Sequence, residues 1–298
     1  MSEGPGPRRV GVVCESTACL PPELVERYSI TVVPVPFVFG SDTFLDGVDL
    51  EPDAFYARLA TSPARPKTSP PQPGAYLTAW ETAACQAEAL VLVTVSATIS
   101  TFERSARLAQ SLAAERLPGT RVVVLDSGSA GMGQGFVVLA AARAAAAGLE
   151  LERVYDQAQA VARHVNLVVT LDTLRYLASA SRIPQVAALV GSLLDIKPII
   201  RVFRGEIQPV TRVRTRRRAL DQLVEVVRQL APAGVPLHLA VQHARASDDA
   251  AQVLRRLSSM RECVEAYITE FTPVMGAYCG PGLVGAAFYP ELSGGPGA

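Results

Sequence analysis

The first half of this chain repeats one pattern: a short apolar run, a polar loop and then a helix. Each run is continuous and rich in β-branched residues, as in strands buried on both faces. Strands that alternate with helices predict a parallel sheet covered on both sides, which is a three-layer α/β domain. The predicted strands span 10–14, 31–39, 90–95 and 121–125, and the predicted helices begin at Pro21 and cover 53–59, 74–86, 101–115 and 129–148.

In the second half the predicted strands and helices follow a different order. A helix over 150–164 leads into it, and two strands flank Arg204-Gly205, a pair typical of a β-hairpin turn. A hairpin combined with crossover helices predicts a mixed-sheet α+β domain. The predicted strands are 167–171, 196–203, 206–214, 237–241 and 264–271, and the predicted helices are 173–179, 215–230 and 247–258.

The predicted fold class is therefore α/β with two domains. We place the N-terminal parallel-sheet domain at 10–162 and the C-terminal mixed-sheet domain at 163–290. Residues 1–9 and 291–298 are rich in Gly, Pro and polar residues, which predicts frayed tails.

Composition excludes several classes of function. The chain has 298 residues and a formal net charge of +0, so no overall charge favours nucleic acid or a membrane surface. Its N-terminus lacks the apolar core of a signal peptide, and the alanine-rich run 136–148 is too short to span a bilayer, so we expect a cytoplasmic protein without stable membrane insertion. The five cysteines and three histidines have no metal-ligand spacing, which predicts reduced thiols and no metal site.

Four hydroxyl-rich loops follow apolar runs in the first half, at 15–19, 68–73, 96–101 and 126–131. Because parallel strands end at one edge of a sheet, these hydroxyls are expected to converge there and to bind a carboxylate or phosphate. Helix capping is the alternative for the loops at 68–73 and 96–101. No base is evident beside the serines, which favours binding over catalysis.

Two glycine-rich stretches have other interpretations. Residues 126–133 lack the Walker spacing and lysine, so their glycines are expected to permit close contact between helix and strand. Residues 273–282 are predicted to form a tight turn where the backbone approaches a ligand.

The second half also contains a run of arginines opposed locally only by Glu206. Three interpretations remain open: a solvated face, a docking surface for an acidic partner or phosphate, and an RNA-binding surface. These arginines are Arg201, Arg204, Arg212, Arg214, Arg216, Arg217 and Arg218.

Taken together, an ordered set of segments resembles the DegV family, the fatty-acid-binding subunits of bacterial fatty acid kinase. The segments include Lys67-Thr68-Ser69-Pro70-Pro71 and Gly280-Pro281-Gly282, and the set covers about residues 10–288; each segment alone is weak, and their order is what is specific. The remaining segments are 15–21, 44–49, 126–133, 173–177, 181–183 and 193–199.

The resemblance implies a long-chain fatty acid buried in a tunnel between the domains, with no other cofactor. It implies that hydroxyl loops hold the carboxylate, and that a kinase catalytic subunit converts it to an acyl phosphate. This chain departs from the family at Tyr278, which stands where the family has a histidine. The implied ligand-binding residues are Thr68, Ser69, Ser96, Thr98 and Tyr278, and Arg182 and Arg214 are implied to work with the kinase.

Other functions stay open from the sequence. The protein could carry fatty acid without a kinase, or it could be a lipid hydrolase that uses Ser96 or Ser127 as nucleophile. The arginine run leaves RNA binding as a third hypothesis.

Overall fold

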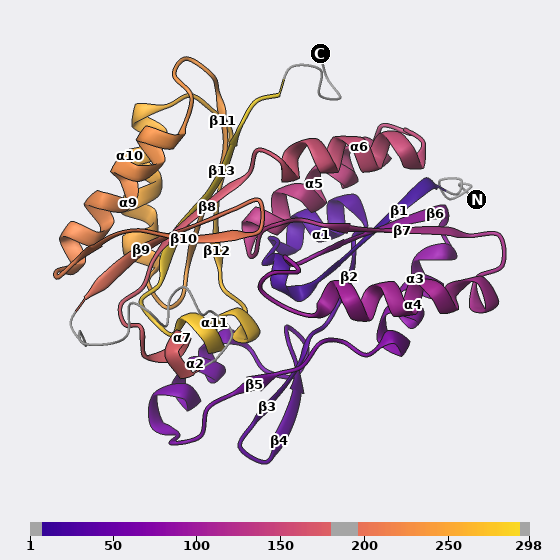
Figure 1. Cartoon of the computed structure of the whole chain (residues 1–298), viewed down its shortest axis with the longest axis horizontal. Coiled ribbons are helices and arrows are strands. Elements are labelled where there is room, and N and C mark those ends of the chain that lie inside the picture. Colours follow the sequence, from indigo (N-terminus) through magenta and orange to yellow (C-terminus); the bar gives the residue numbers. More distant parts are fainter. Residues whose placement is uncertain (1–7, 180–195, 293–298) are drawn as a thin grey trace, which may run out of the picture.

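The computed structural model describes residues 8–179 and 196–292, which build two large sheets (Figure 1). The first sheet has the order β2-β1-β6-β7, and all its neighbouring strands are parallel. This confirms the parallel sheet predicted for the N-terminal half. Its strands are β1 (Arg8–Glu15), β2 (Thr31–Val33), β6 (Ala87–Thr94) and β7 (Arg121–Asp126).

Helices cover both faces of this sheet, which gives three layers. Val13, Leu90 and Leu92 point to the α3 and α4 side, whereas Val12, Val91 and Val93 point to the α5 and α6 side. This alternation follows from the two-residue period of a strand, and it explains why the middle of each long strand is apolar on both faces. The helices are α1 (Pro22–Tyr28), α3 (Pro73–Ala84), α4 (Phe102–Arg116), α5 (Met132–Ala146) and α6 (Leu151–Ala162).

The second sheet is mixed, with the order β10-β9-β8-β13-β11-β12, and only the β11–β12 pair is parallel. Helices α9 and α10 cover its outer face, and its inner face turns towards the N-terminal half (Figure 1). The mixed-sheet prediction is confirmed. The elements are β8 (Asn166–Thr170), β9 (Lys197–Phe203), β10 (Glu206–Val213), α9 (Arg216–Leu230), β11 (Leu237–His243), α10 (Ser247–Met260), β12 (Cys263–Glu270) and β13 (Val284–Pro290).

Strand β13 is central in this sheet but was not predicted. Its first half contains Gly285, Ala286 and Ala287, which have low intrinsic strand propensity, and the strand formers Phe288 and Tyr289 come only after them. Gly285 is needed there because an added Cβ would lie 2.6 Å from Val169 Cγ1 on the neighbouring strand. Contacts with the neighbouring strands, rather than local preference, therefore determine this strand.

The predicted single strand 31–39 is wrong. It splits at Pro34 into β2, which joins the large sheet, and β3 (Pro36–Phe39), which joins a small sheet of order β4-β3-β5. Proline cannot donate to a strand ladder, so the chain changes sheets there. The small sheet also contains β4 (Asp42–Leu45) and β5 (Lys67–Thr68), and α2 (Pro52–Thr61) lies between them in sequence.

The predicted tight turn 273–282 is also corrected, because most of it is a helix, α11 (Pro273–Cys279). Pro273 occupies the first turn, where its missing N–H costs nothing. The turn itself is confined to residues 280–282, where Gly280 and Gly282 have positive φ. A short helix, α7 (Arg175–Ser179), contacts α11.

The chain passes from α6 to β8 over residues 163–165. The predicted tails lie largely outside the described ranges, although β1 already begins at Arg8. Among residues 8–179 and 196–292, no helix is long and apolar enough to cross a membrane.

Candidate functional site

A cavity lies between the two large sheets. Its volume is about 120 Å³, far above the roughly 10–15 Å³ that one water molecule needs. The inner face of the second sheet contributes Leu167, Val169, Ile200 and Val202, and the N-terminal half contributes Val95, Ile99 and Phe102. These are large apolar side chains, so the cavity suits an apolar ligand.

Helix α11 forms one wall of the cavity through Val274, Met275, Tyr278 and Cys279. Asp46, which is buried in the small-sheet region, accepts a hydrogen bond from the Val274 amide at 3.0 Å and so caps the helix. Burial raises the pKa of the Asp46 carboxyl above its usual range.

A second contact fixes the far side of α11. The Tyr56 ring lies so close to Gly276 that an added Cβ would be 2.3 Å from the Tyr56 hydroxyl oxygen. The Tyr56 hydroxyl also donates to the Phe271 carbonyl at 3.4 Å. The N-terminal half therefore positions a helix that belongs to the C-terminal half.

Two of the expected ligand-binding residues meet at the cavity. Thr68 is buried at the end of β5, and its hydroxyl is hydrogen-bonded to the Tyr278 hydroxyl. Both residues line the cavity. Ser69 is exposed, as the two-residue period of an extended chain dictates, and it does not line the cavity.

The other two expected residues bond elsewhere. The Ser96 hydroxyl is buried and lies 3.0 Å from the Thr98 hydroxyl, which donates to the Gly205 carbonyl. Gly205 lies at the tip of the β9–β10 hairpin, and its amide donates to the Gly128 carbonyl at 2.8 Å. The predicted hairpin is present, and its tip docks on the N-terminal half through Thr98 and Gly128. Neither Ser96 nor Thr98 lines the cavity.

Thr17 and Ser100 line the cavity, although sequence reasoning did not single them out as ligand-binding residues. Both belong to predicted hydroxyl loops, so the loop pattern was the signal that could have found them. The Thr17 hydroxyl donates to Gln134 Oε1 at 2.9 Å. The Ser100 hydroxyl oxygen accepts from the Phe102 amide at 3.2 Å, beside the start of α4.

A buried carboxyl group stands behind Thr17. Glu15 is fully buried at the end of β1 and accepts from Gln134 Nε2 at 2.8 Å, the Val95 amide at 3.0 Å and the Tyr76 hydroxyl at 3.0 Å. Burial raises its pKa from 4.5 to about 7, although these hydrogen bonds oppose the shift.

The glycines of the loop 126–133 lie close to residues of the second half of the chain. A Cβ at Gly131 would lie 2.7 Å from Gln242 Oε1, and that same oxygen accepts from the Met132 amide at 2.8 Å. Gly128 has positive φ and faces the Arg204-Gly205 backbone. The loop therefore connects the two halves, and the Ser127 hydroxyl within it donates to the Ser129 carbonyl at 3.2 Å.

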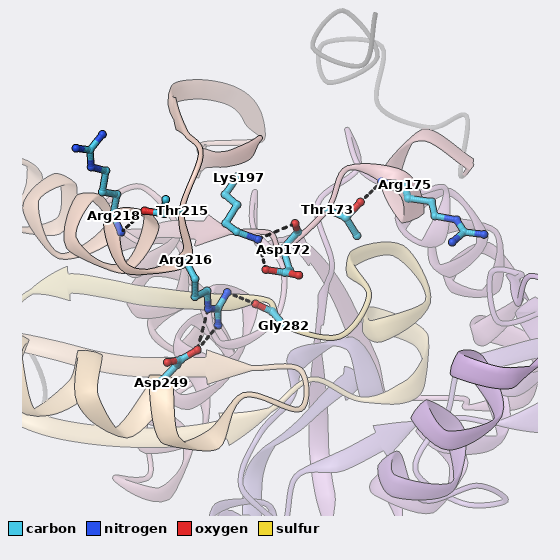
Figure 2. Close-up of polar contacts among 9 residues, drawn as sticks. All are labelled: Asp172, Thr173, Arg175, Lys197, Thr215, Arg216, Arg218, Asp249 and Gly282. Carbon is cyan, nitrogen blue, oxygen red and sulfur yellow. Dashed lines mark hydrogen bonds and ion pairs between the residues drawn. The ribbon is translucent and has the colours of Figure 1, made fainter. Parts of the chain in front are cut away.

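Several of the basic residues are paired. Figure 2 shows Arg216 bonded to Asp249 and to the Gly282 carbonyl, and Lys197 bonded to Asp172. The side chains of Arg175 and Arg218 point away from these contacts (Figure 2).

Other arginines remain open to a partner. Arg212, Arg214 and Arg217 are exposed, and within the described part of the chain none of them has an ion pair. Arg182 lies outside the described residues.

No histidine lies among the described residues that line the cavity. His238 and His243 both lie on β11, which extends two residues beyond the predicted strand, and His238 stacks on Tyr289 between Glu265 and Glu291. Within 8–179 and 196–292, no group of three His, Cys, Asp or Glu side chains is placed to hold a metal ion.

Comparison with known proteins gives one consistent result. The model of the DegV family matches residues 9–291. A DegV domain-containing protein of Mycobacterium bovis is 36% identical over 280 residues, which are 92% of this chain and 95% of the relative.

Two solved structures are similar throughout. One is described as fatty acid binding of a DegV family protein from Thermus thermophilus, with a TM-score of 0.87 and 26% identity over 95% of this chain and 100% of that chain. The other is DegV of Bacillus subtilis, described as a fatty acid binding protein, with a TM-score of 0.86 and 28% identity over the same shares.

Proposed function

Because the chain belongs to the DegV family, we propose that it binds a long-chain fatty acid in the cavity between its two sheets. The observation that carries this proposal is the lining, which is apolar except for hydroxyl groups and one thiol. The fatty acid binding described for the Thermus thermophilus and Bacillus subtilis relatives supports it.

Magnitudes favour an acyl chain as the main source of affinity. Burying about 14 methylene groups at roughly 0.8 kcal/mol each yields about 11 kcal/mol before the costs of binding. One hydroxyl contact contributes about 0.5–1.5 kcal/mol. The chain therefore supplies most of the affinity, and the hydroxyls determine which end of the ligand they hold.

In this proposal Thr68 and Tyr278 contact the carboxyl group directly, because they line the cavity and meet each other. Ser96 and Thr98 act through the hairpin tip, which keeps β9 and β10 in place as a cavity wall. Ser69 faces away from the cavity, so it could contact the ligand only if the loop that carries it changed conformation.

We further propose that the protein presents the carboxyl group to a fatty acid kinase catalytic subunit, which forms the acyl phosphate. The binding subunit then performs no catalysis alone. The exposed Arg214, together with Arg182, is proposed to contact the kinase. Arg214 has no ion pair among the described residues, and an exposed guanidinium can pair with acidic groups or phosphate.

Native mass spectrometry of purified protein tests lipid binding. We expect an added mass equal to that of a fatty acid, lost on delipidation and restored by palmitate or oleate. Protein that carries no lipid and takes up neither acid would defeat the proposal. Hydrolysis of acyl esters that Ser96→Ala abolishes would instead establish an enzyme.

A further inference from the structure

Thr17 lines the cavity, and its hydroxyl could serve a ligand there only as a hydrogen-bond acceptor. Gln134 Nε2 lies between two acceptors, Glu15 Oε2 at 2.8 Å and the Val93 carbonyl at 3.2 Å, so the amide can be oriented in only one way. Its oxygen therefore faces Thr17, which must donate to it. The lone pairs of the Thr17 oxygen are what remains for a ligand.

The other hydroxyls in the lining offer protons. The Ser100 oxygen already accepts from the Phe102 amide, so its own proton is free. Thr68 and Tyr278 share one hydrogen bond, which leaves one of their two protons free. The cavity thus offers donors for a carbonyl oxygen and one acceptor for an O–H group.

The part of the lining that the structure describes supplies no positive charge to balance an anion. The described residues that line the cavity include no lysine, arginine or histidine. The titratable groups among them are Tyr278 and Cys279, both neutral acids, and burial raises the pKa of the Cys279 thiol to about 12.

The groups immediately behind the lining are acids as well. Glu15 lies behind Thr17, Asp46 caps α11, and Cys19 and Tyr56 lie in the same buried cluster. Each of these groups is either neutral or negative, so none adds a positive charge that would stabilise a carboxylate. A carboxyl group surrounded by them is expected to keep its proton more firmly than in water.

Charged residues on the elements that wall the cavity are exposed or already bonded. The cations are Lys67, Arg104, Arg107, Arg116, Arg175, Lys197, Arg201 and Arg212. Lys197 is paired with Asp172 and Arg201 is bonded to Asn166, while the others are exposed. Of the anions on these elements, Glu103 and Glu206 bond to neighbours at the surface, and Glu115 is exposed.

We infer that the cavity holds the fatty acid as the neutral, protonated carboxylic acid. In this arrangement Thr17 accepts from the acid O–H, while Ser100 and the Thr68–Tyr278 pair donate to its carbonyl oxygen. Thr17 and Gln134 are then specificity-determining residues. The inference rests on the proposed fatty acid binding and specifies the ionisation state that the site selects.

The direct test is carbon NMR of protein loaded with palmitate labelled at the carboxyl carbon. At pH 7 we expect the bound resonance at the position of the protonated acid, moving to the carboxylate position only at higher pH. A bound resonance at the carboxylate position at pH 7 would overturn the inference while leaving fatty acid binding intact. Absence of any bound resonance would instead contradict the proposed function.

A second test uses a soluble medium-chain acid, decanoic acid, and needs no label. Binding of the neutral form from a solution of anions should weaken the affinity about tenfold for each pH unit above neutrality. Decanol should bind and decanesulfonate, which stays anionic, should bind at least tenfold more weakly. Equal binding of the sulfonate and the acid would contradict the inference.

Variants separate the contributions. Thr17→Val removes the acceptor and should move the NMR transition to lower pH. Tyr278→His adds a group that carries positive charge below its ordinary pKa of about 6.5, and it should move the transition further in the same direction. Thr43→Val, an exposed position on β4, is the matched control and should leave the transition unchanged. An unchanged transition in both cavity variants would contradict the assignment.

Discussion

The hydroxyl of Thr68 is hydrogen-bonded to the hydroxyl of Tyr278, 210 positions later in the chain. Thr68 ends β5 in the N-terminal half, and Tyr278 lies on α11 of the C-terminal half. One contact therefore joins the two halves at the wall of the cavity, where the ligand's carboxyl group is proposed to lie.

Removing either hydroxyl should weaken fatty acid binding. Thr68→Val and Tyr278→Phe should each reduce affinity about fivefold, because one hydrogen bond contributes about 1 kcal/mol. The double variant should lose less than the product of both effects, since the two hydroxyls share one bond. Calorimetric titration with decanoic acid measures the cycle. Wild-type affinity in Tyr278→Phe would contradict a role for the phenol in binding.

The hairpin tip should affect ligand release rather than the head group. Thr98→Val leaves the Gly205 carbonyl without its donor, which loosens the β9–β10 wall. We expect faster dissociation of fatty acid with an unchanged carboxyl resonance of the bound ligand. A shifted resonance would show that Thr98 contacts the carboxyl group itself.

Gly131 should be required for stability, because it lets the N-terminal half contact Gln242 in the C-terminal half. Gly131→Ala places a Cβ 2.7 Å from Gln242 Oε1 and should lower the free energy of unfolding by about 1–3 kcal/mol more than a matched control. The control is Gly148→Ala, which has positive φ as well but open space around it. Urea unfolding measures both, and equal losses would mean that the contact with Gln242 is unimportant.

Glu15 should make stability fall as pH rises. Its pKa is raised in the folded state, so the folded state holds the proton more tightly than the unfolded state. Its favourable contribution is complete below pH 4.5 and is lost as pH rises from 4.5 to 7. The change amounts to roughly 3 kcal/mol.

Glu15→Gln removes that titration. Between pH 5 and pH 8, the free energy of unfolding of wild type should fall by about 3 kcal/mol more than that of the variant. The other titratable groups contribute the same pH dependence to both proteins, so their contribution cancels when the two are compared. The same pH dependence in both would show that Glu15 does not titrate in this window.

Arg214 should matter for the kinase and not for the lipid. Arg214→Ala is expected to keep wild-type fatty acid affinity, because the side chain is exposed and outside the cavity lining, and to slow acyl phosphate formation with a fatty acid kinase catalytic subunit and ATP. Arg255→Ala, an exposed arginine on α10, is the control. An equal loss of lipid and kinase coupling would contradict this division of roles.

The sequence predicted those helices and strands that are determined by residues within the element itself. The continuous apolar runs predicted β1, β6 and β7, and Arg204-Gly205 predicted the hairpin. Strand β13 was not predicted, because Gly285 is required only by its close contact with Val169 on the neighbouring strand, which the local sequence does not reveal. Helix α11 was missed because the carboxylate that caps it, Asp46, lies 228 residues away.

The residues of the candidate site were likewise predictable only where local sequence determines them. The loops that carry hydroxyls were predictable, but the direction of each hydroxyl was not. Thr98 bonds to Gly205, 107 residues later, and Thr17 bonds to Gln134, 117 residues later. These distant partners determine that Thr68 and Thr17 line the cavity whereas Ser96 does not.

The cavity walls come from both halves of the chain, so neither half alone encloses the ligand. A bound acyl chain would then serve as part of the hydrophobic core. At a free concentration a hundred times its Kd, such a ligand adds about 2.7 kcal/mol to the free energy of unfolding. The lifetime of the folded protein against heat or proteases would consequently rise and fall with the supply of its own ligand.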